Sequence, residues 1–177
     1  DGTTNFIHGV PHFCVSIGIR EKGRLEHGVI FDPVKNELFT TSRGRGATLD
    51  GKRLRMARHT SLEGRLIGCG LPFRKTDDIE LYLNMIRNTA TKVASTRASG
   101  SSALDLAYVA AGRYDGFWEV GLKPWDIAAG ALMVQEAGGI VGDIDGGTNF
   151  MESCNVVAGS PKVFAALVRE LQIAKKG

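Results

Sequence analysis

The chain has 177 residues, of which 43% are hydrophobic and 23% are charged, and its formal net charge at pH 7 is +3. These values are ordinary for a globular protein with one sizeable core or two small subdomains. The small net charge, without aromatic residues interleaved among basic ones, gives no nucleic-acid signal. No apolar stretch is long enough for a membrane span and no leader pattern opens the chain, so the sequence predicts a cytoplasmic protein without a membrane anchor.

The first part of the chain has the pattern of a β-sheet. From His12 to Thr41 the runs FCVSIGI, GVIFDP and ELFTT are separated by EKGR and PVKN, and they predict three strands of an antiparallel meander. The run GRGATLDGKRLR then predicts two short strands joined by an Asp-Gly turn. We interpret RGRG, at residues 43–46, as a solvated loop rather than a binding patch.

After Ser61 strand and helix patterns alternate, which predicts an α/β fold with a mixed sheet flanked by helices. The helix expected in DDIELYLNMIRNTATK has Ile79, Leu83 and Ile86 on one face, which we expect to be buried. The next helix, SSALDLAYVAAG, is apolar almost all round, and PWDIAAGALMVQEAGG is opened by Pro and closed by Gly. The change of pattern predicts a mostly β subdomain at residues 1–60 and an α/β subdomain at residues 61–177. The strands expected in this second part are RLIGCG, KVASTRAS, YDGFWEV, IVGDI and NVVAGS, and PKVFAALVRELQIAKK is its last helix.

The three cysteines are odd in number and widely spaced, in apolar or glycine-rich surroundings. They are Cys14, Cys69 and Cys154. This pattern predicts reduced, packed thiols rather than disulfides or a zinc site.

Two stretches combine glycine with hydroxyl residues. At the start of the chain Asp1 and Gly2 form an acid-glycine turn, followed by the hydroxyls of Thr3 and Thr4. Further along, the SGSS run at residues 99–102 precedes a helix, where free amides and the helix dipole favour an anion. Alone, each has an equally simple structural interpretation as a turn or as a serine N-cap.

Two acids occupy positions that also suggest chemistry. Glu119 ends an apolar strand and must find a hydrogen-bond donor, a cation or a ligand hydroxyl. Asp126 follows Pro124 in the first turn of its helix, where it could serve only as a cap. Taken together, however, the acids and the two glycine-hydroxyl stretches suit a metal-assisted phosphate site, because carboxylates hold hard cations and amides hold phosphate oxygens.

Three longer stretches, DGTTNFIHGVPHFCVSIG, GSSALDLAYVAAGRYDGFWEVGLKPWDIAAG and EAGGIV, resemble the inositol monophosphatase family, most closely its bacterial SuhB-type members. The resemblance runs in register over essentially the whole chain. It implies the layered αβαβα sandwich of the inositol monophosphatase and fructose-1,6-bisphosphatase superfamily. Asp1 matches the second aspartate of the family signature D-x-x-D-G-T. The resemblance therefore implies that the first aspartate, further metal ligands, the N-terminal helices and the first strands lie outside this sequence.

The resemblance also implies roles for single residues. Asp1 and Asp126 would bind catalytic Mg²⁺, and the Thr3 hydroxyl would orient the attacking water, which makes these three the implied catalytic residues. The animal enzymes of the family have Thr and Ala where this chain has Ser101 and Ser102, which leaves the exact substrate open. The implied substrate-binding residues are Gly2, Thr3, Gly100, Ser101, Ser102, Glu119 and Asp126, with the Gly2 and Thr3 amides on the phosphate and Glu119 on an inositol hydroxyl.

The sequence thus predicts a phosphoric monoester hydrolase that uses Mg²⁺ and acts on inositol 1-phosphate or a related small polyol phosphate. Fructose 1,6-bisphosphate, a nucleotide 3′-phosphate and histidinol phosphate remain alternatives within the superfamily, and Glu119 favours a hydroxyl-rich ring. The resemblance also implies a homodimer. A different class of function is a non-catalytic role in transcription antitermination, with contacts to RNA polymerase and Nus factors, as in SuhB-type proteins.

Five other residues invite weaker hypotheses. His8 and His12 flank the first loop without the spacing of metal ligands, so we expect them to serve in packing. We expect Trp118 and Trp125 to anchor the core. Arg97 could orient the SGSS turn by pairing with a carboxylate, or it could be solvated.

Overall fold

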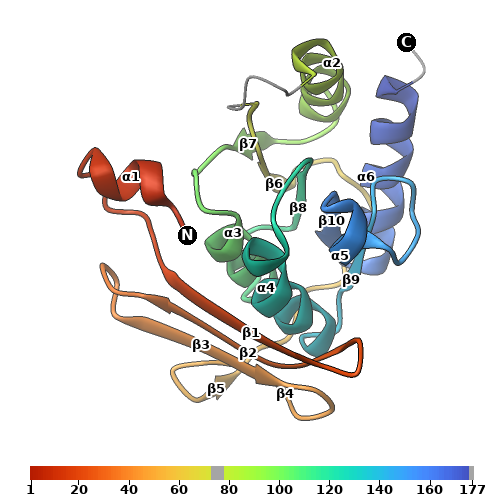
Figure 1. Ribbon diagram of the computed structural model, residues 1–177. Helices are drawn as coiled ribbons and strands as arrows, with labels where there is room; N and C mark the ends of the chain where they lie inside the picture. Colours follow the sequence, from red (N-terminus) through yellow and green to blue (C-terminus); the bar gives the residue numbers. More distant parts are fainter. Residues whose placement is uncertain (73–77, 176–177) are drawn as a thin grey trace.

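An antiparallel sheet of five strands forms one layer of the molecule (Figure 1). The computed structural model describes residues 1–72 and 78–175. Asp50 and Gly51, between the last two strands, have φ values of 49° and 76°, as a tight hairpin turn with two left-handed residues requires. Both the meander and the Asp-Gly turn are confirmed. In sheet order the strands are β1 (Val15–Glu21), β2 (Arg24–Asp32), β3 (Glu37–Ser42), β4 (Gly46–Leu49) and β5 (Lys52–Arg53).

The second sheet is mixed, as the sequence predicts. Strand β6 is parallel to both β7 and β8, whereas β10 is antiparallel to β8 and β9. The order across the sheet is β7 (Ser95–Arg97), β6 (Leu66–Cys69), β8 (Gly116–Glu119), β10 (Val156–Gly159) and β9 (Ile140–Gly142).

Helices α3 (Ser102–Ala110) and α4 (Pro124–Glu136) lie between the two sheets (Figure 1). Every residue of α3 is buried, which agrees with its apolar circumference. Helix α4 packs closely on β1 and β2 because the sheet offers glycines there. A Cβ atom at Gly28 would lie only 2.9 Å from the Cα atom of Ala129.

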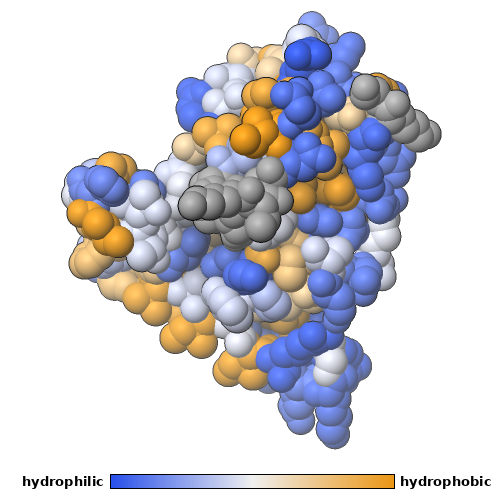
Figure 2. Space-filling view, turned by 45° about the horizontal axis from the view of Figure 1, so that its top comes forward, coloured by the Kyte–Doolittle hydropathy of each residue, from blue (hydrophilic) through white to orange (hydrophobic). Residues whose placement is uncertain are grey.

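On the other side of the second sheet, α2 (Ile79–Ala90) and α6 (Pro161–Ala174) pack against each other (Figure 1). The layers therefore follow the order sheet, helices, sheet, helices. Two short helices, α1 (Thr3–Ile7) and α5 (Phe150–Ser153), lie beside these layers. Figure 2 shows hydrophobic side chains on the surface over α1, where Phe6 and Ile7 are 65% and 72% exposed. The division at residues 60 and 61 into two subdomains stays a prediction.

The buried face of α2 differs from the predicted one. Ile79 and Leu83 are exposed, and Ile86 is only half-buried. The helix instead buries Tyr82 and Met85, and the Tyr82 hydroxyl donates to the Val120 carbonyl at 2.6 Å. The apolar residues of α2 form a wide stripe, so their spacing fits more than one buried face, and contacts with the second sheet determine which face is buried.

Of the two tryptophans, Trp118 is fully buried, as predicted, but Trp125 is 68% exposed, and its expected core role was wrong. Trp125 lies in the first turn of α4, where Asp126 is only half-buried and all-round burial begins at Ile127. The first turn thus extends beyond the layers that cover the rest of the helix.

The three cysteines are free thiols rather than disulfides, as predicted, and Cys14 and Cys69 are buried whereas Cys154 is half-buried. Burial raises the pKa of Cys69 to about 12, so this thiol stays protonated at neutral pH. None of the helices in residues 1–72 and 78–175 combines the length and apolar character needed to cross a membrane.

Candidate active site

A cavity of about 360 Å³ lies where the carboxyl ends of β6 and β8 meet the amino ends of α1, α3 and α4. Its volume falls within the range of small-molecule sites. Residues that are about a hundred positions apart in the sequence meet here, including Asp1 and Ser101, which are hydrogen-bonded to each other. We call it the active-site cavity. All of the predicted site residues line it, namely Asp1, Gly2, Thr3, Gly100, Ser101, Ser102, Glu119 and Asp126.

The backbone at Gly2 turns sharply to present amides at the start of α1. Gly2 has a φ of 83°, and a Cβ atom there would lie 2.9 Å from the His12 carbonyl oxygen, so no larger residue fits. Among the described residues, no acceptor receives a hydrogen bond from the Gly2 or Thr3 amide. These two amides are therefore available for an anionic ligand in the cavity.

Asp1 caps helix α3 from a distant part of the chain. Its Oδ2 atom accepts hydrogen bonds from the Ser101 hydroxyl at 2.7 Å and from the Ala103 amide at 2.9 Å. The anion at the SGSS helix start is thus the Asp1 carboxylate, and the Ser101 side chain makes no cap bond to its own helix. In the described part of the chain, the Oδ1 atom of Asp1 accepts no hydrogen bond.

Asp126 is arranged in the same way at the start of α4. One carboxylate oxygen, Oδ2, accepts a hydrogen bond from the Lys123 amide at 3.1 Å. The positive end of the helix dipole stabilises the charged form of a carboxylate at this position. Both Asp1 and Asp126 therefore use one oxygen to hold a helix start, and within the described residues the second oxygen accepts no hydrogen bond and is left for a ligand.

These two carboxylates fit part of a Mg²⁺ site. Hard oxygen ligands suit this ion, which commonly takes one or two protein carboxylates and completes its shell with substrate phosphate and water. Within residues 1–72 and 78–175, no group of three or more His, Cys, Asp or Glu side chains is placed to hold a metal. Asp1 and Asp126 would thus supply two of the ligands of such an ion.

Glu119 is a third acid in the lining of the cavity, and it has a hydroxyl partner. It is almost fully buried, and its Oε2 atom accepts a hydrogen bond from the Ser102 hydroxyl at 2.6 Å. Gly70 permits this position, because a Cβ atom there would lie 2.3 Å from the Glu119 carboxyl carbon. The carboxylate is therefore held in one orientation at the wall of the cavity.

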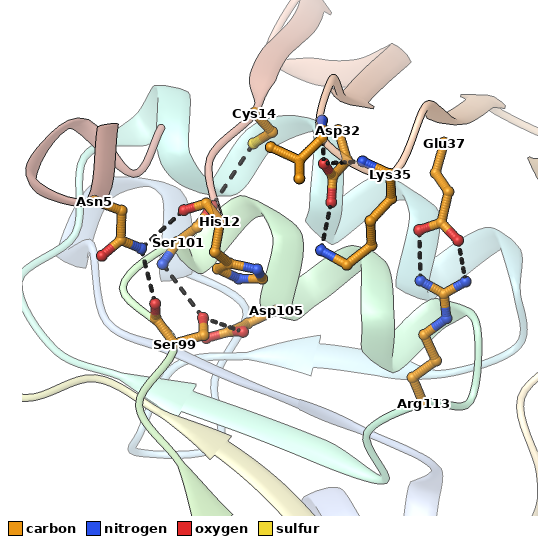
Figure 3. Close-up of polar contacts among 11 residues, drawn as sticks. Asn5, His12, Cys14, Asp32, Lys35, Glu37, Ser99, Ser101, Asp105 and Arg113 are labelled. Carbon is orange, nitrogen blue, oxygen red and sulfur yellow. Dashed lines mark hydrogen bonds and ion pairs between the residues drawn. The ribbon is translucent and has the colours of Figure 1, made fainter. Parts of the chain in front are cut away.

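The sequence analysis missed Asp105, which also lines the cavity. This residue is 2% exposed and accepts a hydrogen bond from the Ser99 hydroxyl at 2.6 Å (Figure 3). Burial raises the pKa of Asp105 to about 8, so its carboxyl is mostly protonated at neutral pH. A single acid within an otherwise apolar helix was the available sequence signal.

Asn5 was missed as well, although it joins two walls of the site. Its Nδ2 group donates to the carbonyls of His12 at 2.8 Å and Ser99 at 2.9 Å (Figure 3). Asn5 also lies against Gly100, where a Cβ atom would come within 2.9 Å of the amide nitrogen. Helix α1 is thereby tied to the turn that precedes α3.

The remaining candidates lie outside the cavity lining. His8 is exposed, and His12 is half-buried with its ring 6.0 Å from the ring of Tyr108, which agrees with a packing role. Arg97 is exposed and donates to the Ser95 hydroxyl and the Thr96 carbonyl. With no carboxylate partner in the described part of the chain, Arg97 matches the solvated alternative.

Comparison with known proteins agrees with this two-sheet fold. The sequence pattern of the "Inositol monophosphatase family" matches residues 1–176. The chain is 59% identical over 174 residues to a Pseudomonas aeruginosa protein called "Nus factor SuhB", and 48% identical over 172 residues to an "Inositol-1-monophosphatase" of Mesorhizobium japonicum. The alignments cover 97% of this chain in both cases, with 64% of the first relative and 65% of the second.

A solved structure shows the same fold. The extragenic suppressor protein suhB of Bartonella henselae superimposes with a TM-score of 0.94 at 46% identity, over 97% of this chain and 67% of that one. The fold is thus the layered α/β sandwich expected for the inositol monophosphatase and fructose-1,6-bisphosphatase superfamily. The chain belongs to the inositol monophosphatase family, and it spans about two thirds of the length of the relatives that it matches.

Proposed function

We propose that the protein hydrolyses the phosphate monoester of inositol 1-phosphate or a related small polyol phosphate with the help of Mg²⁺. The observation that carries this proposal is that the carboxylates of Asp1 and Asp126 line one cavity with the amides of Gly2 and Thr3, which donate to no acceptor among the described residues. Carboxylates suit the cation and amides suit the phosphate, so both parts of a metal-bound phosphate ester find partners.

Each residue contributes a separate task. The Gly2 and Thr3 amides hold phosphate oxygens at the positive end of α1, and the Thr3 hydroxyl orients the attacking water. Asp1 and Asp126 would hold Mg²⁺, which supplies an activated water and stabilises the charge of the leaving oxygen when it is bound. The hydrogen bonds from Asp1 to the start of α3 and from Asp126 to the start of α4 keep these carboxylates fixed before the substrate arrives.

Glu119 supports the proposed substrate class. Glu119 is held by Ser102 and can accept a hydrogen bond from a ring hydroxyl, which favours a polyol. Ser101 and Gly100 complete this part of the cavity. Fructose 1,6-bisphosphate, a nucleotide 3′-phosphate and histidinol phosphate remain the alternative substrates.

A second candidate function is a role in transcription antitermination with RNA polymerase and Nus factors. It is favoured by the similarity to several relatives that are called "Nus factor SuhB". A homodimer is part of the proposal, and the exposed Phe6 and Ile7 on α1 would suit a contact between subunits. A pull-down with RNA polymerase and Nus factors, using wild-type protein and Asp126→Asn, separates the two functions, because only catalysis needs the Asp126 charge.

The catalytic proposal is tested by Asp126→Asn, assayed as phosphate release from inositol 1-phosphate. The change keeps the size of the side chain but removes a charge that faces the cation, so we expect nearly complete loss of activity with an unchanged fold. Asp145→Asn is the matched control, since Asp145 is exposed, pairs with Lys175 and does not line the cavity. Activity of Asp126→Asn within about threefold of wild type, under ~1 kcal/mol in the barrier, would remove Asp126 from the metal site.

A further inference from the structure

A second cavity of about 390 Å³ lies beside the segment that leaves β5, between the carboxyl end of α4 and the amino end of α6. It shares no lining residue with the active-site cavity. We call it the arginine cavity. The lining residues that matter here are Arg53, Arg55, Arg58, Glu136 and Ser160.

The arginine cavity has an excess of positive charge. Across residues 1–72 and 78–175, its three arginines form no ion pair. The one acid in the lining, Glu136, accepts the Gly44 amide with one oxygen and the Gly46 amide with the other, both at 2.8 Å. Its charge is therefore already engaged by the backbone, and the guanidinium groups are left for another anion.

Ser160 supplies an independent sign of a missing partner. It is 2% exposed and lines the cavity, yet its hydroxyl has no hydrogen-bond partner among the described residues. A buried polar group without a partner is costly, so such a group in a native protein calls for an explanation. A ligand oxygen in the arginine cavity would provide it.

Ser160 also marks the amino end of α6, a helix of 14 residues. Pro161 has no amide hydrogen, and within the described chain the amides of Lys162 and Val163 donate to no acceptor. This end of a helix favours anions. The negative carboxyl end of α4 also borders the cavity and would repel an anion. This repulsion is weak, because the Ala137 carbonyl there already accepts a hydrogen bond from the Met56 amide at 3.0 Å.

We propose that the arginine cavity binds a phosphate dianion, free or carried by a small organic molecule. The Ser160 hydroxyl donates a hydrogen bond to it, and the guanidinium groups of Arg55 and Arg58 pair with its charge. The cavity volume suits a small molecule. The site needs no metal, which distinguishes it from the active-site cavity.

The test is isothermal titration of the protein with inorganic phosphate and, separately, with glycerol 3-phosphate, both in the presence of EDTA. We expect wild-type protein to bind at least one of them, with an affinity that falls as salt is added. Tighter binding of inorganic phosphate indicates a free-phosphate site, and tighter binding of glycerol 3-phosphate indicates a small phosphate ester. No binding of either compound at millimolar concentrations overturns the proposal.

Variants locate the binding. The double change Arg55→Ala with Arg58→Ala should weaken it at least tenfold, and Ser160→Ala should weaken it several-fold. Removing the hydroxyl of Ser160 should leave the ligand-free protein at least as stable, because that hydroxyl bonds to nothing in the described fold. Thermal unfolding tests this point, and a rise in Tm with phosphate should be seen in wild type and be reduced in Ser160→Ala.

Two controls complete the test. Arg24→Ala with Arg87→Ala removes the same charge from exposed positions elsewhere and should leave the affinity unchanged. Thr3→Val alters the active-site cavity and should also leave it unchanged. Equal affinity in wild type and the Arg55/Arg58 variant, or loss of binding in Thr3→Val alone, would show that phosphate binds elsewhere and would refute the site.

Discussion

The charge of Asp105 depends strongly on its place in the fold. Burial raises the pKa of its carboxyl to about 8, against the hydrogen bond from Ser99 and with the help of the nearby charge of Glu119. In an unfolded chain the pKa of an aspartate is about 4. Between about pH 4 and pH 8 the folded protein thus keeps a proton that the unfolded chain has released. The contribution of Asp105 to the free energy of unfolding therefore falls as pH rises through this window.

We expect Asp105→Asn to remove this pH dependence. The amide is neutral at every pH, and its oxygen can still accept the hydrogen bond from Ser99. Urea unfolding without divalent cations, at about pH 5 and about pH 8, should show wild type losing roughly 2–4 kcal/mol more than the variant between the two conditions. Equal losses would mean that Asp105 is ionised in the folded protein.

A single site residue can be predicted from the sequence where a local pattern, such as a turn or a helix start, coincides with a side chain suited to the chemistry. Gly2 was predictable as a turn residue, and Asp126 as an acid in a helix start. The hydrogen-bond partners of the site residues were not predictable. The bond from Ser101 to Asp1, for example, joins positions far apart in the chain. Asp105 and Asn5 were missed because their importance lies entirely in such distant contacts.

Helices α3 and α4 make a close contact that bears on the site. Gly130 of α4 faces Leu106 of α3, and a Cβ atom at Gly130 would lie 2.4 Å from the Cβ atom of Leu106. The two helices hold Asp1 and Asp126 through their first turns, so their separation sets the spacing of the two carboxylates. Glycine is therefore required here for packing, although it is a poor helix former.

We predict that Gly130→Ala destabilises the protein. Better helix propensity would contribute about 1 kcal/mol, but forcing two buried helices apart costs typically 1–3 kcal/mol and more for so close a contact. A fall in the urea midpoint checks this result. Gly147→Ala is the matched control, because no atom lies within 4 Å of the added carbon there, and it should change the midpoint little. A midpoint for Gly130→Ala at or above that of wild type would contradict the packing argument.

The elements also show what local patterns can and cannot determine. The hairpin between β4 and β5 was predictable because an Asp-Gly pair specifies its own turn. The buried face of α2 was not predictable, because its apolar residues form a stripe wider than the buried face. Only the position of the second sheet determines that Tyr82 and Met85 are buried. The types of the longer elements were thus predictable from sequence, whereas the short helices α1 and α5 were not, and the choice of face depended on tertiary contacts.

In the whole molecule, α4 reaches from one cavity to the other. Asp126 in its first turn lines the active-site cavity, and Glu136 at its carboxyl end lines the arginine cavity. With a rise of 1.5 Å per residue, the 13 residues of the helix separate its ends by about 20 Å. Sites so far apart, without shared lining residues, are expected to behave independently unless the helix itself moves.

This arrangement predicts two separable classes of phosphate binding. With Mg²⁺ present, titration of wild-type protein with inorganic phosphate should show a metal-dependent class, which Asp126→Asn abolishes, and a metal-independent class, which Arg55→Ala with Arg58→Ala abolishes. The physical reason is that the first cavity offers carboxylates, which repel phosphate unless a cation lies between them, whereas the second offers guanidinium groups that attract it directly. Combining all three substitutions should remove both classes, and the losses in binding free energy should add. If Asp126→Asn also weakened the metal-independent class, the two cavities would be coupled through α4, and the assumption of independent sites would be wrong.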